Sequence, residues 1–145
     1  MPTIHREAIV PYTQEQMFVL VNDVSTYKEF VPWCVDSRVL SRGQDEIRAQ
    51  LAFERGGMQK SFTTLNRLQP HKMMEMRLLD GPFKQLEGFW QFEENGSGCH
   101  VKLDLEFEFS NKILAMMFGP LFNQVASTLV DCFIKRADEV YGKKD

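Results

Sequence analysis

The hydrophobic and polar positions of this chain follow a helical period near both ends and a strand period between them. The longest helical pattern runs over Pro120–Tyr141, where apolar residues recur every three or four positions and polar residues occupy the opposite side. Pro120 suits the first turn of a helix and Gly142 its end, so we expect a helix of about 33 Å there. The preceding stretch, Asn111–Phe118, predicts one or two helical turns that break at Gly119–Pro120.

The N-terminal part predicts one strand and two short helices. Thr3–Val10 has the composition of a strand and ends at a proline. Thr13 and Gln16 have the spacing of a capping box, which marks the start of a helix. A second short helix is expected around Tyr27 and Phe30, because another proline closes that segment.

Apolar and polar residues alternate over about six further segments, most clearly in VKLDLEFEF at 101–109. Gly56–Gly57, Gln69–Pro70, Asp80–Pro82 and Asn95–Gly98 are turn signals between these segments. Consecutive strands with short connections predict an antiparallel meander with one buried face, which the long helix is broad enough to cover. We therefore expect an α+β helix-grip fold: a curved antiparallel sheet of about seven strands around a long C-terminal helix, with two short helices after the first strand.

Length and composition fit one globular domain over residues 1–145, with 43% hydrophobic and 26% charged residues. The net charge of −3 gives no global reason to expect nucleic acid or an acidic membrane surface as a partner, and we expect no binding to DNA. Within Cys34–Lys72, however, seven basic residues face four acidic ones, a local charge of +3. Three widely spaced cysteines argue against a disulfide framework, and Met1–Glu7 lacks the pattern of a secretion signal, so we expect a cytoplasmic protein.

The pattern offers no catalytic constellation. The three histidines are far apart in sequence and form no metal-ligand or Cys–His pattern, so we expect them to be exposed or locally bonded. Cys99 and His100 are neighbours on a strand and point to opposite faces. We expect a protein that is not an enzyme and that needs neither a metal nor a cofactor for activity.

The residues expected to face inward are large and flexible, which leaves two interpretations open. They either interdigitate as a solid core or line an apolar cavity between sheet and helix. Thr64 and Asn66 fall on the inward register of the fourth strand, where they would need partners in a dry core or would orient a ligand head group. The candidate lining residues are Phe62, Met74, Met76, Leu86, Trp90, Phe107 and Phe122.

Two segments predict a mouth for such a cavity. The segment 27–34 places aromatic and apolar side chains around a proline corner, and 80–86 places Phe83 on a loop. The structural alternatives are a hydrophobic plug and a loop anchor. If the segments form a gate, Trp33→Ala and Phe83→Ala should weaken ligand binding more than stability. The candidate gate residues are Tyr27, Phe30, Val31, Trp33 and Phe83.

Three motifs carry a resemblance to a known family: YxxFVPWC at 27–34, DGPFKxLxGxWxF at 80–92 and DxFxxRAxxVYG at 131–142. They resemble the coenzyme Q-binding START-like proteins, in particular the bacterial branch of ribosome association toxins, which is also grouped with polyketide cyclase/dehydrase-type domains. The resemblance covers essentially the whole chain. It implies a START/Bet v 1-like helix-grip fold and a cavity for ubiquinone or a similar polyprenyl lipid that supports respiration.

For the bacterial branch, the resemblance also implies a toxin that binds the large ribosomal subunit, blocks subunit association and has a small ubiquitin-like antitoxin partner. The leading hypothesis is thus a non-catalytic lipid-binding protein, and the second is a translation inhibitor. In the second, Arg38, Arg42 and Arg48 would contact rRNA from one outer surface. A cyclase-like enzyme is a third hypothesis, without an acid/base pair to support it. We expect a cytoplasmic protein that is either free, peripheral to the inner membrane or associated with the ribosome.

Overall fold

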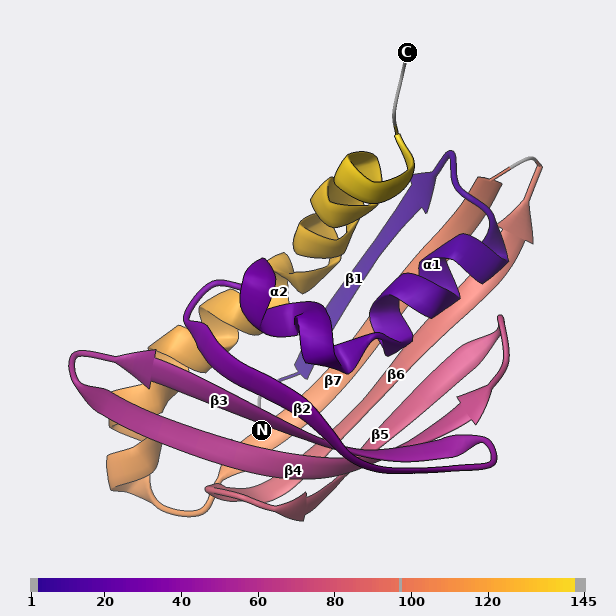
Figure 1. The fold of residues 1–145 in the computed structure, drawn as a ribbon. Helices are drawn as coiled ribbons and strands as arrows, with labels where there is room; N and C mark the ends of the chain where they lie inside the picture. Colours follow the sequence, from indigo (N-terminus) through magenta and orange to yellow (C-terminus); the bar gives the residue numbers. More distant parts are fainter. Residues whose placement is uncertain (1–2, 97, 143–145) are drawn as a thin grey trace.

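The computed structural model describes residues 3–96 and 98–142, and it shows a curved sheet wrapped around a long helix (Figure 1). Seven antiparallel strands follow the order β1-β7-β6-β5-β4-β3-β2. This arrangement confirms the helix-grip fold expected from the sequence. The elements are β1 (Thr3–Val10), α1 (Gln14–Asn22), the 3-10 helix η1 (Val24–Glu29), β2 (Cys34–Gly43), β3 (Glu46–Arg55), β4 (Met58–Gln69), β5 (Met73–Asp80), β6 (Phe83–Asn95), β7 (Gly98–Phe109) and α2 (Lys112–Tyr141).

Local sequence signals fix several boundaries as expected. The hydroxyl of Thr13 accepts from the backbone N–H of Gln16, whose side-chain oxygen accepts from the N–H of Thr13, which completes the capping box of α1. Gly56 and Gly57 both have positive φ at the β3–β4 turn, a conformation that glycine adopts without steric cost. The expected turn 95–98 joins β6 to β7, although its residue 97 lies outside the described residues.

The C-terminal helix is longer than the sequence pattern predicts. It begins at Lys112 and passes through Pro120 without a break, so its 30 residues span about 45 Å. Asn111 caps it, because its side-chain oxygen accepts from the N–H of Leu114 at 2.9 Å. Pro120 removes one backbone hydrogen bond, but buried side chains on both sides of it, Phe118 and Leu121, hold the helix against the sheet. The predicted break at 119–120 was therefore wrong.

α2 supplies one wall of the core, and α1 and η1 pack beside its C-terminal half. The hydroxyl of Tyr141 donates to the carbonyl of Gln16 at 3.0 Å, and Arg136 pairs with Glu29 at 2.8 Å. By length and hydropathy alone α2 could cross a membrane, but its inner stripe packs against the sheet as that of a core helix does. Phe133 and Trp90 meet edge to face in the centre of this core, with ring centroids 5.3 Å apart.

Phe83 lies in the core and not on a loop. It is the first residue of β6, is 6% exposed, and its ring centroid lies 4.8 Å from that of Phe109 and 5.0 Å from that of Phe122. The preceding turn is tight, because a Cβ at Gly81 would lie 2.5 Å from the Cβ of Phe62. The loop position predicted for Phe83 was wrong, and we now expect truncation of this side chain to lower stability.

Candidate functional site: an apolar cavity between the sheet and α2

A cavity of about 70 Å³ lies between the sheet and the middle of α2. Its walls come from η1, from β3 to β7 and from α2, so every layer of the fold contributes to it. Small side chains create the space, because Ala49 on β3 and Ala126 on α2 face it. The lining residues are Val24, Tyr27, Val31, Ala49, Leu51, Phe53, Phe62, Thr64, Asn66, Met76, Leu86, Trp90, Leu105, Phe122, Val125, Ala126 and Leu129.

Two neighbouring polar side chains interrupt these apolar walls. The hydroxyl of Thr64 donates to the side-chain oxygen of Asn66 at 2.8 Å, and both residues are buried on β4. Among the described residues, the amide nitrogen of Asn66 has no hydrogen-bond acceptor. The side-chain N–H groups of Asn66 are therefore available to a ligand atom that enters the cavity.

The residues predicted to line or gate a cavity divide into two groups. Tyr27, Val31, Phe62, Met76, Leu86, Trp90 and Phe122 line it, whereas Phe30, Trp33, Met74, Phe83 and Phe107 do not. Met74 and Phe107 are buried elsewhere in the core. Sequence reasoning missed the lining residues Ala49 and Ala126, because an alanine on an inward register looks like ordinary core.

The first half of segment 27–34 makes close contacts with the neighbouring helices. The buried hydroxyl of Tyr27 donates to the carbonyl of Val21, and burial raises the pKa of Tyr27. Phe30 packs on Phe133 with ring centroids 5.2 Å apart and lies under the guanidinium of Arg136, 5.1 Å from its ring centroid. This part of the segment thus acts as an anchor between η1 and α2.

Trp33 is the exposed residue of this segment. Its side chain is 39% exposed, and its backbone has a φ of 60°, which is rare for a bulky residue. Its carbonyl accepts from the backbone N–H of Glu54 at 3.0 Å, which ties it to the end of β3. Trp33 therefore lies beside the β3–β4 hairpin and outside the cavity.

A second, smaller hollow of about 20 Å³ adjoins the cavity. Phe53, Phe62 and Phe122 line both spaces, so they form a partition between them. On its other side the second hollow is bounded by Lys60 on β4, Pro82 in the β5–β6 turn, and residues of the first half of α2. At this end of the sheet, the partition separates the cavity from the smaller hollow that Lys60 and Pro82 bound.

The three arginines proposed to contact rRNA do not share one face. Arg38 pairs with Gln50 in the β2–β3 ladder and binds the carboxylate of Asp36 at 2.6 Å. A register shift between Val39 and Ser41 then reverses the alternation of β2. Arg42 consequently pairs with the buried Ile47, while Arg48 pairs with Ser41 on the outer face. The expectation of a single arginine surface was wrong.

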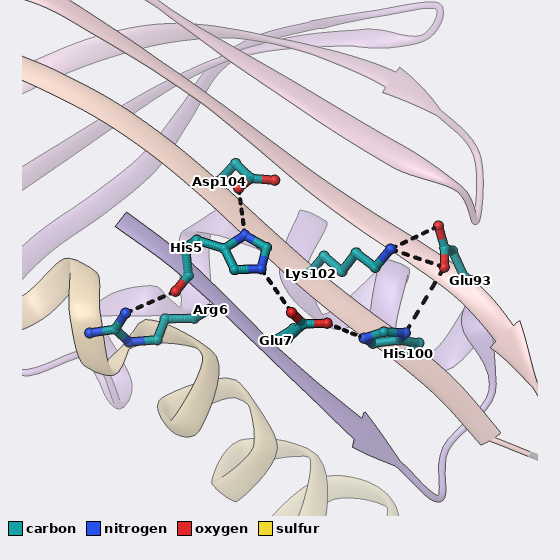
Figure 2. A network of polar contacts seen from close by, with 7 residues as sticks. All are labelled: His5, Arg6, Glu7, Glu93, His100, Lys102 and Asp104. Carbon is teal, nitrogen blue, oxygen red and sulfur yellow. Dashed lines mark hydrogen bonds and ion pairs between the residues drawn. The ribbon is translucent and has the colours of Figure 1, made fainter. Parts of the chain in front are cut away.

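The outer face carries a network of charged side chains that runs across β1, β7 and β6 (Figure 2). His5 lies between Asp104, at 2.6 Å from Nδ1, and Glu7, at 2.9 Å from Nε2. Glu7 also contacts Nε2 of His100 at 2.7 Å. Both His5 and Glu7 are exposed, so the network is solvated and local, as expected for these histidines. Among the described residues, no group of three or more His, Cys, Asp or Glu side chains has an arrangement that could hold a metal ion.

This network makes stability depend on pH. The contacts with Glu7 and Asp104 raise the pKa of His5 above 6.5. Their contribution to the stability of the folded protein is therefore complete below pH 6.5 and is lost as pH rises through the raised pKa. The contacts with His5 and His100 hold the pKa of Glu7 below 4.5, so their contribution is lost as pH falls through the lowered value. The network therefore stabilises most between about pH 4.5 and pH 6.5.

We expect Glu7→Gln to lower the midpoint of thermal unfolding more at pH 5.5 than at pH 8.5. The reason is that protonated His5 loses its partner only in the acidic window. The measurement is thermal unfolding of both proteins at the two pH values. Glu106→Gln is the control, because Glu106 lies on the same face and has no ion pair among the described residues. Equal shifts at the two pH values would contradict the network.

The cysteines are not poised as nucleophiles. Burial raises the pKa of Cys34 and of Cys99 to about 11, so both thiols are protonated at neutral pH. Cys99 and His100 pair with Val10 and Ile9 respectively, on opposite faces of the sheet, as expected from the sequence. Together with the apolar cavity, this arrangement defines a class of protein: a helix-grip protein with an apolar site between its sheet and its long helix.

Comparison with known proteins gives the family. The protein-family model described as polyketide cyclase / dehydrase and lipid transport matches residues 10–134, and the chain belongs to this family. It is 44% identical over 140 residues to the ribosome association toxin RatA of Pseudomonas aeruginosa, covering 96% of this chain and 97% of that protein. It is 30% identical over 142 residues to the mitochondrial coenzyme Q-binding protein COQ10 homolog B of Xenopus laevis, covering 94% of this chain and 58% of that protein.

Solved structures place the fold in the same group. An 18 kDa protein of Caulobacter crescentus superposes with a TM-score of 0.75 at 30% identity, over 99% of this chain and 100% of that one. A Streptomyces aromatase/cyclase superposes with a TM-score of 0.80 at 14% identity, over 94% of this chain and 93% of that one. The second likeness concerns the fold alone. Together with the family match, these structures confirm the START-like resemblance seen in the sequence.

Proposed function

We propose that this protein binds, without catalysis, an apolar ligand with a polar head group of the ubiquinone or polyprenyl lipid type. The observation that carries the proposal is the cavity, whose apolar walls are interrupted by Thr64 and Asn66. The relative named as a coenzyme Q-binding protein supports this class of ligand. We further propose that binding of this ligand supports respiration in the cell.

The polar pair defines how the head group lies. A quinone carbonyl accepts hydrogen bonds and donates none, so it complements the available N–H groups of Asn66. Since the oxygen of Asn66 already accepts a hydrogen bond from Thr64, the amide nitrogen is the group left to bind the ligand. A hydrocarbon tail would then contact apolar residues such as Leu105 and Leu129.

The volume of the cavity sets a condition on binding. Ligand sites typically measure about 300–1,000 Å³, whereas this cavity measures about 70 Å³. A quinone with its tail therefore requires the partition of Phe53, Phe62 and Phe122 to move, which would join the two hollows. Flexible Met76 in the wall can adapt to the ligand shape.

The proposal is tested by titrating the protein with ubiquinone analogues of increasing tail length. Each additional buried methylene should contribute about 0.8 kcal/mol, or roughly a fourfold gain in affinity, until the tail leaves the cavity. Asn66→Ala should weaken quinone binding about fivefold, because one hydrogen bond of about 1 kcal/mol is lost.

Thr63→Ala is the control for Asn66→Ala, because Thr63 lies on the same strand but outside the residues that line the cavity. Affinity that does not change with tail length would contradict the proposal. An equal loss of affinity in Thr63→Ala and Asn66→Ala would show that the polar pair Thr64–Asn66 has no specific role in binding.

Two observations support the view that the site is not catalytic. Among the described residues that line the cavity, Tyr27 is the one titratable side chain, and its hydroxyl donates to a backbone carbonyl. The relatives at 41–44% identity are named as toxins and not as enzymes. A cyclase-like activity would need an acid or base at the ligand, which these walls do not supply.

A second candidate function is inhibition of translation by binding the large ribosomal subunit and blocking subunit association. The observation that favours it is 44% identity, over nearly all of both chains, to a protein named ribosome association toxin. The β2–β3 hairpin carries Arg42 and Arg48 on its two faces, which suits insertion between phosphate groups. A small ubiquitin-like antitoxin partner and a cytoplasmic location on the ribosome belong to the same proposal.

A further inference from the structure

The first two turns of α2 carry large exposed apolar side chains in addition to those that face the core. Leu114 and Phe118 pack against the core, but Ile113 and Met117 on the flank of the helix are 68% and 40% exposed. Met116 beside them is 78% exposed. The first two turns of α2 thus present three large apolar side chains to solvent.

These turns lie at the end of the molecule where the cavity approaches the surface. Figure 1 shows the beginning of α2, the β3–β4 hairpin and the β5–β6 turn at the same end of the sheet. Lys60 and Pro82 bound the smaller hollow together with Phe118 of α2, which brings the three segments around one opening. Met58 at the hairpin tip adds another apolar side chain, 40% exposed.

The charge of this end is opposite to that of the remaining chain. We define the docking end as residues 53–60, 80–84 and 109–117. It holds four basic and two acidic residues, a local charge of +2, whereas the whole chain carries −3. The basic residues are Arg55, Lys60, Lys84 and Lys112, and the acidic residues are Glu54 and Asp80.

We infer that the docking end binds the surface of an anionic phospholipid bilayer. Ile113, Met116 and Met117 would insert among the acyl chains near the head groups, and the flanking lysines would contact lipid phosphates. Positive charge around an exposed apolar stripe is complementary to such a surface. The inference extends the proposed function, because a lipid could pass between the bilayer and the cavity at this end without crossing water.

Flotation with vesicles tests the inference. The full chain is mixed with vesicles of phosphatidylcholine alone and with vesicles containing one quarter phosphatidylglycerol. We expect the protein to float with the anionic vesicles and to float several-fold less with the neutral ones. Ile113→Asp/Met116→Asp should lower the bound fraction at least fivefold. Both substitutions lie near the helix N-terminus, where a negative charge is compatible with folding.

Val140→Asp/Val19→Asp is the matched control, because these valines are 49% and 51% exposed on helices away from the docking end and the charge change is the same. We expect this control to float like the unmodified protein, and circular dichroism to show that both double variants are folded. Equal flotation of the Ile113/Met116 variant and the unmodified protein would overturn the inference. Self-association of the unmodified protein that Ile113→Asp/Met116→Asp abolishes, without vesicle binding, would instead assign this surface to a second copy.

Vesicle binding and ligand binding are separable. Ala126→Leu fills the cavity but leaves the docking end intact, so this variant should float with anionic vesicles as the unmodified protein does. If quinones fail to bind while vesicles do, the proposed ligand is wrong and the docking surface stands. If quinones bind and vesicles do not, the docking inference fails alone.

Discussion

Ala126→Leu is expected to lower the affinity for a quinone or isoprenoid ligand by at least tenfold while leaving the protein folded. Ala126 is 2% exposed and faces the cavity from the middle of α2. A leucine there places an isobutyl group in a space of about 70 Å³, where the ligand head group would otherwise lie. Leucine is also a good helix former, and at this position the added methyl groups enter existing empty space and not packed core, so we expect little loss of stability. Ligand titration and thermal unfolding measure the two effects.

Ala137→Leu provides the matched control for this prediction. Ala137 lies on the same helix and is fully buried, but it is not among the residues that line the cavity. Forcing a leucine into this packed position should cost about 1–3 kcal/mol of stability and leave ligand affinity per folded molecule unchanged. Wild-type affinity in Ala126→Leu would show that the ligand binds elsewhere.

Arg42→Glu/Arg48→Glu is expected to weaken binding to the large ribosomal subunit at least tenfold, if the second candidate function holds. The two arginines extend from opposite faces of one hairpin, whereas Arg38 is already paired with Asp36 and is left unchanged. Two phosphate contacts predict that a fourfold rise in salt lowers the affinity of the unmodified protein about tenfold. Sedimentation with purified subunits at 50 and 200 mM salt measures both effects.

Lys102→Glu/Lys135→Glu carries the same change of net charge on other surfaces and should bind like the unmodified protein. Subunit binding that is insensitive to salt would contradict a phosphate-based contact. An equal loss of subunit binding in both double variants would indicate that binding depends on net charge. The β2–β3 hairpin would then not be the contact surface.

The sequence could predict most of the fold because the alternation of apolar and polar residues reports which face of each strand is buried. The strand over 101–109 is the clearest example, and its expected inward residues Val101, Leu103 and Phe107 are all buried. Helix boundaries were harder to predict from the sequence. The break predicted at Pro120 follows a local rule, whereas the observed continuous helix depends on contacts with distant strands.

The site was only partly predictable for related reasons. Inward register identified Thr64, Asn66 and Met76, but register cannot distinguish a residue that lines a cavity from one that fills the core. Ala126 contributes to the cavity because its side chain is too small to fill the space, and a single sequence does not show where such a space lies. The position of Arg42 depends on a register shift in β2, and no residue in this part of the sequence indicates that shift.

Native mass spectrometry of the freshly purified protein, followed by organic extraction, is the decisive test of lipid binding in the cavity. We expect a fraction of the protein with the added mass of one lipid, an extract that contains a quinone or isoprenoid, and loss of that fraction in Ala126→Leu. The measurement is completed by adding ubiquinone analogues to the protein. A mass equal to that of the chain alone, with no saturable binding of any added analogue, would show that the cavity does not hold such a lipid.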